Sequence, residues 1–253
     1  MNRDDLQEKI LRPDAAGPER TAERPGQPLR DGLAAAWPIC LGYVPLGVAL
    51  GVLARQAGIG PAWIGLMSVL VFAGSAQFIA VAMLAGGASA GAIILTTFVV
   101  NFRHFLMSSA LAVPLTGVHR GFLSLFAYGI TDESFAVNLA RFRRGGWDRW
   151  RALTVNQAAN AAWVAATVAG GLAGAFIPPG AFGIDYALIA MFICLLVFQL
   201  QERIHLFTAL LSGAFAVLWY LAVPGDSYVV AASTAAATLG FLLQRRRGGR
   251  GTA

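Results

Sequence analysis

Apolar runs long enough to cross a lipid bilayer fill most of this chain, and they limit its fold more than any other feature. The bilayer core offers no water to backbone N–H and C=O groups, so a run of about 20 apolar residues must form a helix. The composition agrees, because 57% of the residues are hydrophobic and only 13% are charged. The sequence predicts an all-α polytopic membrane protein with about eight spans, at Leu33–Ala54, Ala62–Ala85, Gly91–Val113, Phe122–Ala140, Thr154–Phe176, Ile184–Leu200, Ile204–Ala222 and Tyr228–Leu243.

The charges outside these runs predict an orientation. Residues 1–31 mix acidic and basic side chains with Pro and Gly and contain no apolar core, which predicts a disordered cytoplasmic tail. A transmembrane domain over 32–244 and a basic cytoplasmic tail over 245–253 follow. With the N-terminus inside, about sixteen basic residues are cytoplasmic, against Arg55 and Arg120 outside. We therefore expect both termini inside; merging the two helices around QERIH would give seven spans.

Two short echoes raise the question of an internal repeat. The triplet LAR occurs at 53–55 and 139–141, and the triplet AGG at 85–87 and 169–171. Each pair falls at the same place in successive three-helix units, and an odd number of helices inverts the second unit. Inverted repeats with broken helices at the midplane are a recurrent transporter architecture. A chain rich in Ala and Gly also produces such triplets by chance, so both explanations stay open at this stage.

Two of the runs carry residues that favour a broken helix near mid-depth. In the first run a central proline removes a backbone donor among several glycines, which predicts a kink or break. In the second, unwinding of VFAGSAQF would free backbone groups to bind a zwitterion. Close packing of the small residues, with the amide bonded across helices, is the structural alternative. The candidate binding residues are Gly42, Pro45, Gly74, Ser75, Ala76 and Gln77.

The middle of the third and fourth runs holds ionisable side chains. Arg103 and His104 follow Asn101 in the third run, and Asp132 and Glu133 lie at similar depth in the fourth. A charge at mid-bilayer costs about 2.5–3.5 kcal/mol on insertion scales, so such residues face a protein interior or a water path. We expect Arg103 to pair with one carboxylate, because successive helices are usually neighbours. The unpaired carboxylate would suit a proton or an ammonium group; a purely structural ion pair is the alternative.

The fifth run adds two amides to the candidate site. Asn156 and Asn160 are four residues apart, so they share one helix face. The sequence contains no zinc-protease, serine-hydrolase or nucleotide-binding motif. We therefore expect no enzymatic activity, no cofactor and no metal site. Nucleic-acid binding is not expected either, because the basic residues cluster where membrane loops carry them.

Four segments of the chain together resemble the AzlC family, the large subunits of bacterial branched-chain amino acid exporters. They are GYVPLGVALG at Gly42, VFAGSAQF around Gly74, NFRHFLMSSAL from Asn101 and TDESFAV around Asp132, within a resemblance that covers roughly 32–243. The resemblance implies export of valine, leucine and isoleucine, with methionine as a further candidate, across the bacterial inner membrane. It also implies coupling to the proton motive force and a small AzlD-type membrane subunit as partner.

Depth and polarity suggest how such a site would work. The segment 74–77 and the Pro45 region are expected to contact the substrate. Arg103 is expected to bind an acidic side chain or the substrate carboxylate, and Asp132 or Glu133 the ammonium group or a coupling proton. Membrane lipids are expected partners, and the oligomeric state is left open. The alternative function is a structural or assembly subunit whose buried charges fix helix packing while a partner holds the conduction path.

Overall fold

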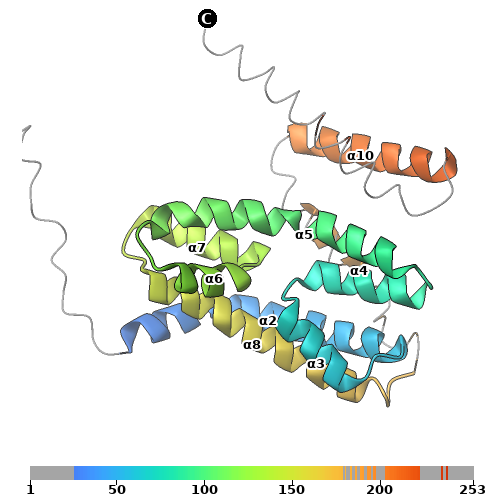
Figure 1. Ribbon diagram of the computed structural model, residues 1–253, viewed down its shortest axis with the longest axis horizontal. Helices are drawn as coiled ribbons and strands as arrows, with labels where there is room; N and C mark the ends of the chain where they lie inside the picture. Colours follow the sequence, from blue (N-terminus) through green and yellow to red (C-terminus); the bar gives the residue numbers. More distant parts are fainter. Residues whose placement is uncertain are drawn as a thin grey trace, which may run out of the picture.

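The computed structural model describes residues 26–178 and 203–222, together with scattered positions between 180 and 197 and residues 235 and 238. All secondary structure in these residues is helical, which confirms the all-α prediction (Figure 1). The α-helices are α2 (Gln27–Gln56), α3 (Pro61–Leu70), α4 (Gly74–Ala85), α5 (Ala90–Ala112), α6 (Arg120–Tyr128), α7 (Asp132–Arg144), α8 (Arg149–Ala173) and α10 (Arg203–Ala222), and a 3-10 turn, Val113–Leu115, follows α5.

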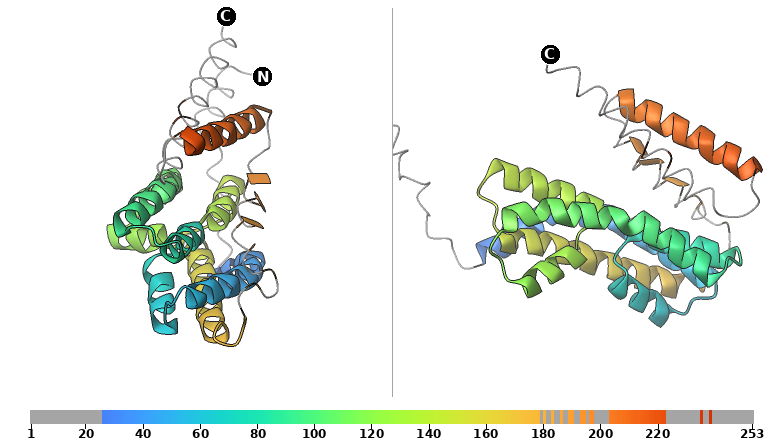
Figure 2. Two further views of the ribbon diagram at one scale, coloured as in Figure 1. Left: turned by 90° about the vertical axis from the view of Figure 1, so that its right-hand side faces the viewer. Right: turned by 45° about the horizontal axis from the view of Figure 1, so that its top comes forward.

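Three of these helices, α2, α5 and α8, run the length of the bundle. Helices α2 and α8 lie side by side and point the same way, because Gly32 lies against Thr154 near their starts and Gly51 against Thr167 near their ends (Figure 2, right). A Cβ atom at Gly51 would collide with the main chain at Thr167, and one at Gly170 would collide with the main chain of Val48. Such small residues allow two membrane helices to approach closely. Helix α5 runs in the opposite direction along the same bundle (Figure 1).

Between α2 and α5 the chain forms a helical hairpin, α3–α4, that enters the bundle only halfway. Helix α3 starts beside the end of α8 and finishes in the middle, where Thr167 donates a hydrogen bond to Ser68 (2.8 Å). Residues 71–73 are not helical, and α4 then begins against Trp163. From there α4 runs back toward the end of the bundle at which α2 finishes (Figure 1).

A second hairpin, α6–α7, enters from the opposite end. At the start of α6, Phe122 packs edge-on against Trp150 at the start of α8, with ring centroids 5.3 Å apart. At the end of α6, the Tyr128 hydroxyl accepts a hydrogen bond from Asn160, halfway along α8 (3.2 Å). Residues 129–131 interrupt the helix, and α7 returns toward the start of α8 (Figure 1).

The prediction of single spans over Ala62–Ala85 and Phe122–Ala140 is therefore wrong. Helices α3 and α4 have 10 and 12 residues, and α6 and α7 have 9 and 13. Ten helical residues rise about 15 Å, which is half of a hydrocarbon core about 30 Å thick. Each apolar run is thus divided into two half-length helices, and both hairpin tips end at mid-depth.

The hairpins also change the side on which one loop lies. Because the chain enters and leaves each hairpin at the same end, Arg120 lies where α2 and α8 begin, near the arginine-rich segment 141–151. The predicted topology, with Arg120 on the same side as Arg55, is wrong at this point, because Arg55 lies at the opposite end of the bundle, next to Gly174. Arg120 therefore joins the basic residues of the expected cytoplasmic side, and the charge bias between the two sides becomes larger.

Helix α2 continues without interruption through Pro38 and Pro45, so the predicted break at Pro45 is wrong. Proline removes one backbone hydrogen bond and crowds the preceding turn, but membrane helices tolerate it where neighbouring helices support the backbone. Helix α8 packs along one face of α2, and Pro45 lies exposed on another. Helix α2 also begins early, so residues 27–31 of the expected tail are helical.

The remaining span predictions fall partly within the described residues. Helix α10 confirms a helix at Ile204–Ala222, whereas Ile184–Leu200, Tyr228–Leu243, and residues 1–25 and 245–253 of the expected tails lie largely or wholly outside the described residues. Helix α2 and the stretch Ala90–Leu115 are the two described helices that are long and apolar enough to cross a membrane. Hairpins thus replace two of the eight predicted spans; membrane crossing by the other six stays a prediction, as does the three-helix repeat.

The described helices show an internal relation of another kind. Helix α2 followed by hairpin α3–α4 resembles α5 followed by hairpin α6–α7, since each unit is a long helix and then a hairpin with its tip in the middle (Figure 1). The two units enter from opposite ends because α2 and α5 run in opposite directions. The expected three-helix repeat would instead equate the continuous α2 with the interrupted α6–α7.

Candidate functional site

The two hairpin tips meet in the middle of the bundle and enclose a small cavity. Its volume is about 30 Å³, enough for a few water molecules. Residues of both tips line it together with residues of all three long helices. The lining residues are Tyr43, Leu46, Phe72, Ala73, Gly74, Ser75, Arg103, His104, Thr131, Glu133 and Trp163.

The tip of hairpin α3–α4 presents backbone donors to this cavity. The interruption falls at residues 71–73, within VFAGSAQF, whereas residues 74–77 form the first turn of α4. Gly74 lies directly against Trp163, whose ring would be 3.0 Å from an added Cβ atom. Ala73 precedes the helix and supplies no side-chain cap. The first N–H groups of α4, at Gly74 and Ser75, therefore lack an intrahelical acceptor and form the positive end of the helix dipole.

The tip of hairpin α6–α7 is capped and acidic instead. The Thr131 hydroxyl accepts from the Ser134 N–H (3.3 Å), and the Ser134 hydroxyl accepts from the Thr131 N–H (2.9 Å), which makes a capping box. Asp132 and Glu133 occupy the first turn of α7. The helix dipole favours negative charge at this position. The second tip therefore holds two carboxylates at mid-depth, at the end of α7 where the helix dipole stabilises negative charge.

Arg103 of α5 connects the two tips. Its guanidinium forms an ion pair with Asp132 (2.9 Å) and donates a hydrogen bond to the Ser75 hydroxyl (2.5 Å). The side chains of Arg103 and Asp132 are each 29% exposed, so the pair is largely withdrawn from solvent. The Nε atom of Arg103 is buried and has no hydrogen-bond partner among the described residues. The expected ion pair is therefore present, and Asp132 is the carboxylate that forms it.

Glu133 has a different environment from Asp132. Its carboxylate lines the cavity and accepts a hydrogen bond from the hydroxyl of Tyr43 on α2 (2.7 Å). The Tyr43 oxygen also lies 2.8 Å from the Thr131 hydroxyl. Within the described part of the chain, no basic side chain lies within ion-pair distance of Glu133. Among the described residues that line the cavity, Glu133 is thus a carboxylate without a basic side chain as its ion-pair partner.

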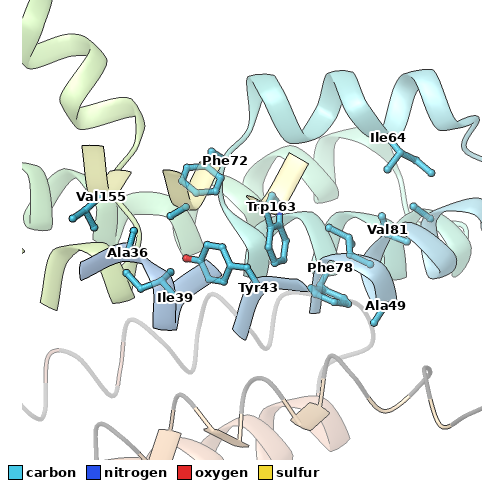
Figure 3. Packing of buried hydrophobic residues seen from close by; sticks show 13 residues of the cluster. Ala36, Ile39, Tyr43, Ala49, Ile64, Phe72, Phe78, Val81, Val155 and Trp163 are labelled. Carbon is cyan, nitrogen blue, oxygen red and sulfur yellow. The ribbon is translucent and has the colours of Figure 1, made fainter. Parts of the chain in front are cut away.

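Aromatic and aliphatic side chains form the rest of the wall. The Tyr43 ring meets Trp163 and Phe72 edge-to-face, with centroid distances of 5.2 and 6.3 Å. Figure 3 shows these three rings grouped within the buried apolar cluster. Leu46, one turn beyond Tyr43 on α2, also lines the cavity. The wall is apolar on this side and charged on the side of Arg103 and Glu133.

Gln77 is placed differently from the other GSAQ residues. It is buried, and its amide accepts from the Trp163 indole N–H (2.8 Å) and donates to the Ser68 hydroxyl (3.0 Å). Ser68 is bonded in turn to Thr167 of α8 (2.8 Å). These bonds tie α3 and α4 to α8. Gln77 does not line the cavity. Its contacts are those of the structural alternative, in which the amide forms hydrogen bonds across helices.

The two asparagines of α8 are also bonded elsewhere. Asn156 accepts from Asn138 of α7 (3.0 Å) and donates to the Phe126 carbonyl (2.9 Å), and it is fully buried. Asn160 donates to the Tyr128 hydroxyl on the exposed side of α8. Neither lines the cavity. Both hold hairpin α6–α7 against α8.

The other candidate residues divide between the cavity and the outer surface. His104 lines the cavity beside Arg103. The Oδ1 atom of Asn101, one turn before His104, is buried without a hydrogen-bond partner among the described residues. Ala76 is buried outside the lining, whereas Gly42 and Pro45 are exposed on α2. The structure thus brings Gly74, Ser75, Arg103, His104 and Glu133 to the cavity, with Asp132 bonded to Arg103.

Sequence reasoning missed two polar residues of the site, Tyr43 and Thr131. Tyr43 lies between Gly42 and Val44 in an apolar run, where a tyrosine looks like an ordinary hydrophobic residue. Thr131 is followed by Asp132 and Glu133, and a threonine directly before acidic residues is typical of a helix N-terminus. That pattern could have located the second tip.

This arrangement defines a class of protein. A helical membrane bundle with half-length helices that meet around a charged midplane cavity is the architecture used by solute transporters, whose sites lie at this depth. Irregular backbone and charged side chains are tolerated at mid-depth because they are enclosed in protein.

The chain belongs to the AzlC protein family, whose model matches residues 38–177. It is 28% identical to the branched-chain amino acid transport protein AzlC of Bacillus subtilis (strain 168), over 83% of this chain and 82% of that protein. It is 30% identical to the inner membrane protein YgaZ of Escherichia coli (strain K12), over 74% and 80%. An uncharacterized membrane protein of Archaeoglobus fulgidus is 32% identical over 81% and 91%. No solved structure matches the chain at a significant level.

Proposed function

We propose that this protein exports branched-chain amino acids across the bacterial inner membrane, in exchange for protons and together with a small AzlD-type subunit. The observation that carries the proposal is the composition of the midplane cavity. It combines the guanidinium of Arg103, the carboxylate of Glu133 and an apolar wall of Leu46, Phe72 and Trp163. A B. subtilis relative with which this chain shares most of its length is named a branched-chain amino acid transport protein.

These groups match the three parts of an apolar amino acid. Arg103, Ser75 and the first N–H groups of α4 provide donors for the substrate carboxylate. Glu133 provides an acceptor for the ammonium group, and the aromatic wall suits a branched aliphatic side chain. A cationic or acidic side chain would lie against Phe72 and Trp163 without a partner, and such burial is costly. Zwitterions with apolar side chains are therefore the favoured substrates.

The cavity also indicates that transport needs a conformational change. A volume of about 30 Å³ holds a few water molecules and is too small for isoleucine. The two tips must part to admit a substrate. One hairpin enters from each end of the bundle. Movement of hairpin α3–α4 away from the cavity therefore opens it toward one side of the membrane, and movement of hairpin α6–α7 opens it toward the other. The two openings correspond to the two states of alternating access.

Orientation and energy source complete the proposal. The arginine-rich segment 141–151 and Arg120 lie at the end where α2 and α8 begin, which supports placing that end in the cytoplasm. Hairpin α6–α7 then enters from the cytoplasm and α3–α4 from outside. The sequence contains no nucleotide-binding motif, so an ion gradient is the energy source we propose.

Efflux from dipeptide-loaded cells tests the proposal. Cells that express the chain with its small partner are loaded with an isoleucine dipeptide, and isoleucine release is followed against empty-vector cells. Arg103→Ala removes a charged donor worth about 1.5–3 kcal/mol, so efflux should fall about 10- to 150-fold. Arg120→Ala is the matched control, because Arg120 is exposed at the start of α6.

Two results would contradict the proposal. One is efflux no faster than in empty-vector cells with the wild-type chain present in the membrane. The other is equal efflux from Arg103→Ala and Arg120→Ala cells at equal protein levels. If the purified chain binds no isoleucine while its partner does, the chain is an assembly subunit instead.

A further inference from the structure

We infer that the Glu133 carboxylate is the shared site at which a proton and the substrate ammonium compete, with the Tyr43 hydroxyl as its partner in both states. This inference rests on the proposed function and deepens it, because it assigns the coupling step to one of two neighbouring carboxylates. Asp132 is then a structural partner of Arg103 and does not carry the coupling proton.

The contacts of the two carboxylates separate their roles. Asp132 is neutralised by Arg103 at 2.9 Å and is not among the residues that line the cavity. Glu133 lines the cavity and accepts one hydrogen bond, from the uncharged Tyr43 hydroxyl. A carboxylate without a cationic partner, withdrawn from bulk water, gains the most from binding a proton or an ammonium group. Only Glu133 offers that acceptor to a substrate inside the cavity.

The hydroxyls around Glu133 fit either occupant. When Glu133 is charged, Thr131 donates to the Tyr43 oxygen and Tyr43 donates to Glu133, and the oxygen–oxygen distances of 2.8 and 2.7 Å suit both bonds. When Glu133 carries a proton, it donates to Tyr43, which then donates to Thr131. Each oxygen keeps a partner in both states. The edge-to-face contacts with Trp163 and Phe72 hold the Tyr43 ring in place for either arrangement.

The charged and titratable groups that face Glu133 come from three elements. They are Tyr43 on α2, Arg103 and His104 on α5, and Asp132 on its own helix. The cavity residues contributed by α8 and by hairpin α3–α4 carry no charge. Because Arg103 is compensated by Asp132, Glu133 is the acidic group of the cavity that is free to exchange its occupant.

Competition at one carboxylate produces exchange transport. If the ammonium group and the proton cannot occupy Glu133 together, the chain carries one of them in each direction. A proton that enters down its gradient then drives the amino acid out. A proton bound elsewhere in the cavity, with the substrate present, would instead give transport of both in one direction.

The experiment measures isoleucine binding to the purified full chain, with its small partner where the two copurify, across the whole pH range in which the protein stays folded. Wild-type affinity should fall about tenfold per pH unit below the midpoint of the pH dependence, which is the slope for one competing proton. About one proton per bound isoleucine should be released into weakly buffered solution below that midpoint. This second measurement needs no variant and is independent of folding defects.

Four variants assign the site. Glu133→Gln should bind more weakly and with an affinity independent of pH, whereas Asp132→Asn should keep the pH dependence. Tyr43→Phe removes a hydrogen bond that is stronger with the charged carboxylate than with its protonated form, so its midpoint should move to higher pH. Tyr128→Phe is the matched control, because the Tyr128 hydroxyl bonds the Val69 carbonyl away from the cavity, and its midpoint should not move.

The outcomes separate this inference from the function on which it rests. Wild-type binding that is independent of pH and releases no proton overturns the inference and leaves amino acid transport standing. If the isoleucine affinity still depends on pH in Glu133→Gln but not in Asp132→Asn, the inference is overturned in favour of Asp132. Absence of isoleucine binding by the wild-type protein at every pH overturns the proposed function and this inference with it.

Discussion

Replacement of Gly51 by alanine tests the closest helix contact in the structure. An added Cβ atom would lie 2.8 Å from the carbonyl carbon of Gly170, and closer still to the Thr167 carbonyl oxygen and the Gly171 nitrogen. These are main-chain atoms of a 25-residue helix, so no side chain can rotate out of the way. The only relief is for α2 and α8 to move apart.

The cost of that movement can be worked from the contact. An ordinary carbon–carbon separation of about 3.5–4.0 Å requires a displacement of about 1 Å, and a gap of that size forfeits up to about half of the dispersion energy at the contact. Overpacking of a rigid core costs about 1–3 kcal/mol, and we expect the upper end here because the obstacle is backbone. The better helix propensity of alanine returns about 0.5–1 kcal/mol. A net loss of about 2 kcal/mol is expected.

Gly42→Ala on the same helix is the matched control, since a Cβ atom there has nothing within 4 Å. It should change stability by no more than about 1 kcal/mol, in the stabilising direction. Denaturant titration of the purified proteins in detergent, followed by tryptophan fluorescence, measures both variants. Stabilities of Gly51→Ala and Gly42→Ala that agree within about 0.5 kcal/mol would refute the close approach of α2 and α8.

Two further variants probe contacts outside the cavity. Gln77→Leu leaves the buried Trp163 N–H without its acceptor, so the same titration should show a loss of about 2 kcal/mol, with isoleucine affinity unchanged in the folded fraction; weakened binding at full stability would instead make Gln77 a substrate ligand. Asp31→Asn removes the ion pair with Arg151 between the starts of α2 and α8 (3.0 Å). Because the Asp31 side chain is 39% exposed and the buried Arg151 keeps a second ion pair with Asp148, the loss should stay below about 1 kcal/mol and shrink in high salt; a larger, salt-independent loss would show that Arg151 depends on Asp31.

Sequence patterns predicted the level of the site better than its topology. The midspan positions of the charges were enough to predict that Arg103 pairs with Asp132 or Glu133, because opposite charges at one depth in neighbouring segments stabilise each other; the choice of Asp132 comes from the structure. Hydropathy could not reveal the hairpins. A run such as Ala62–Ala85 has the same apolar profile whether it crosses the bilayer once or turns at mid-depth after ten residues.

The local signals for the two tips were unequal. Gly129, and Thr131 directly before two acidic residues, are typical of a helix end followed by a helix start. In a single span over Phe122–Ala140 the same acidic residues look like charges in the middle of a helix. No capping side chain precedes Gly74, so only its small neighbours indicated the first tip. The role of Tyr43 depends on residues 88 and 90 positions away, and no local pattern predicts such a contact.

The distribution of contacts suggests which helix controls access. Buried hydrogen bonds attach each tip to α8, through Gln77 and Trp163 for α4 and through Asn138 and Asn156 for α7. Arg103 joins the tips to each other from α5, a helix whose apolar window is only 6% buried, compared with 44% for α2. The weakly packed helix therefore carries the side chain that closes the cavity. A shift of α5 that keeps Asp132 and releases Ser75 would free the α3–α4 tip, and the opposite shift would free the α6–α7 tip. In the proposed transport cycle, one guanidinium with two separable partners would therefore open the cavity toward one side at a time.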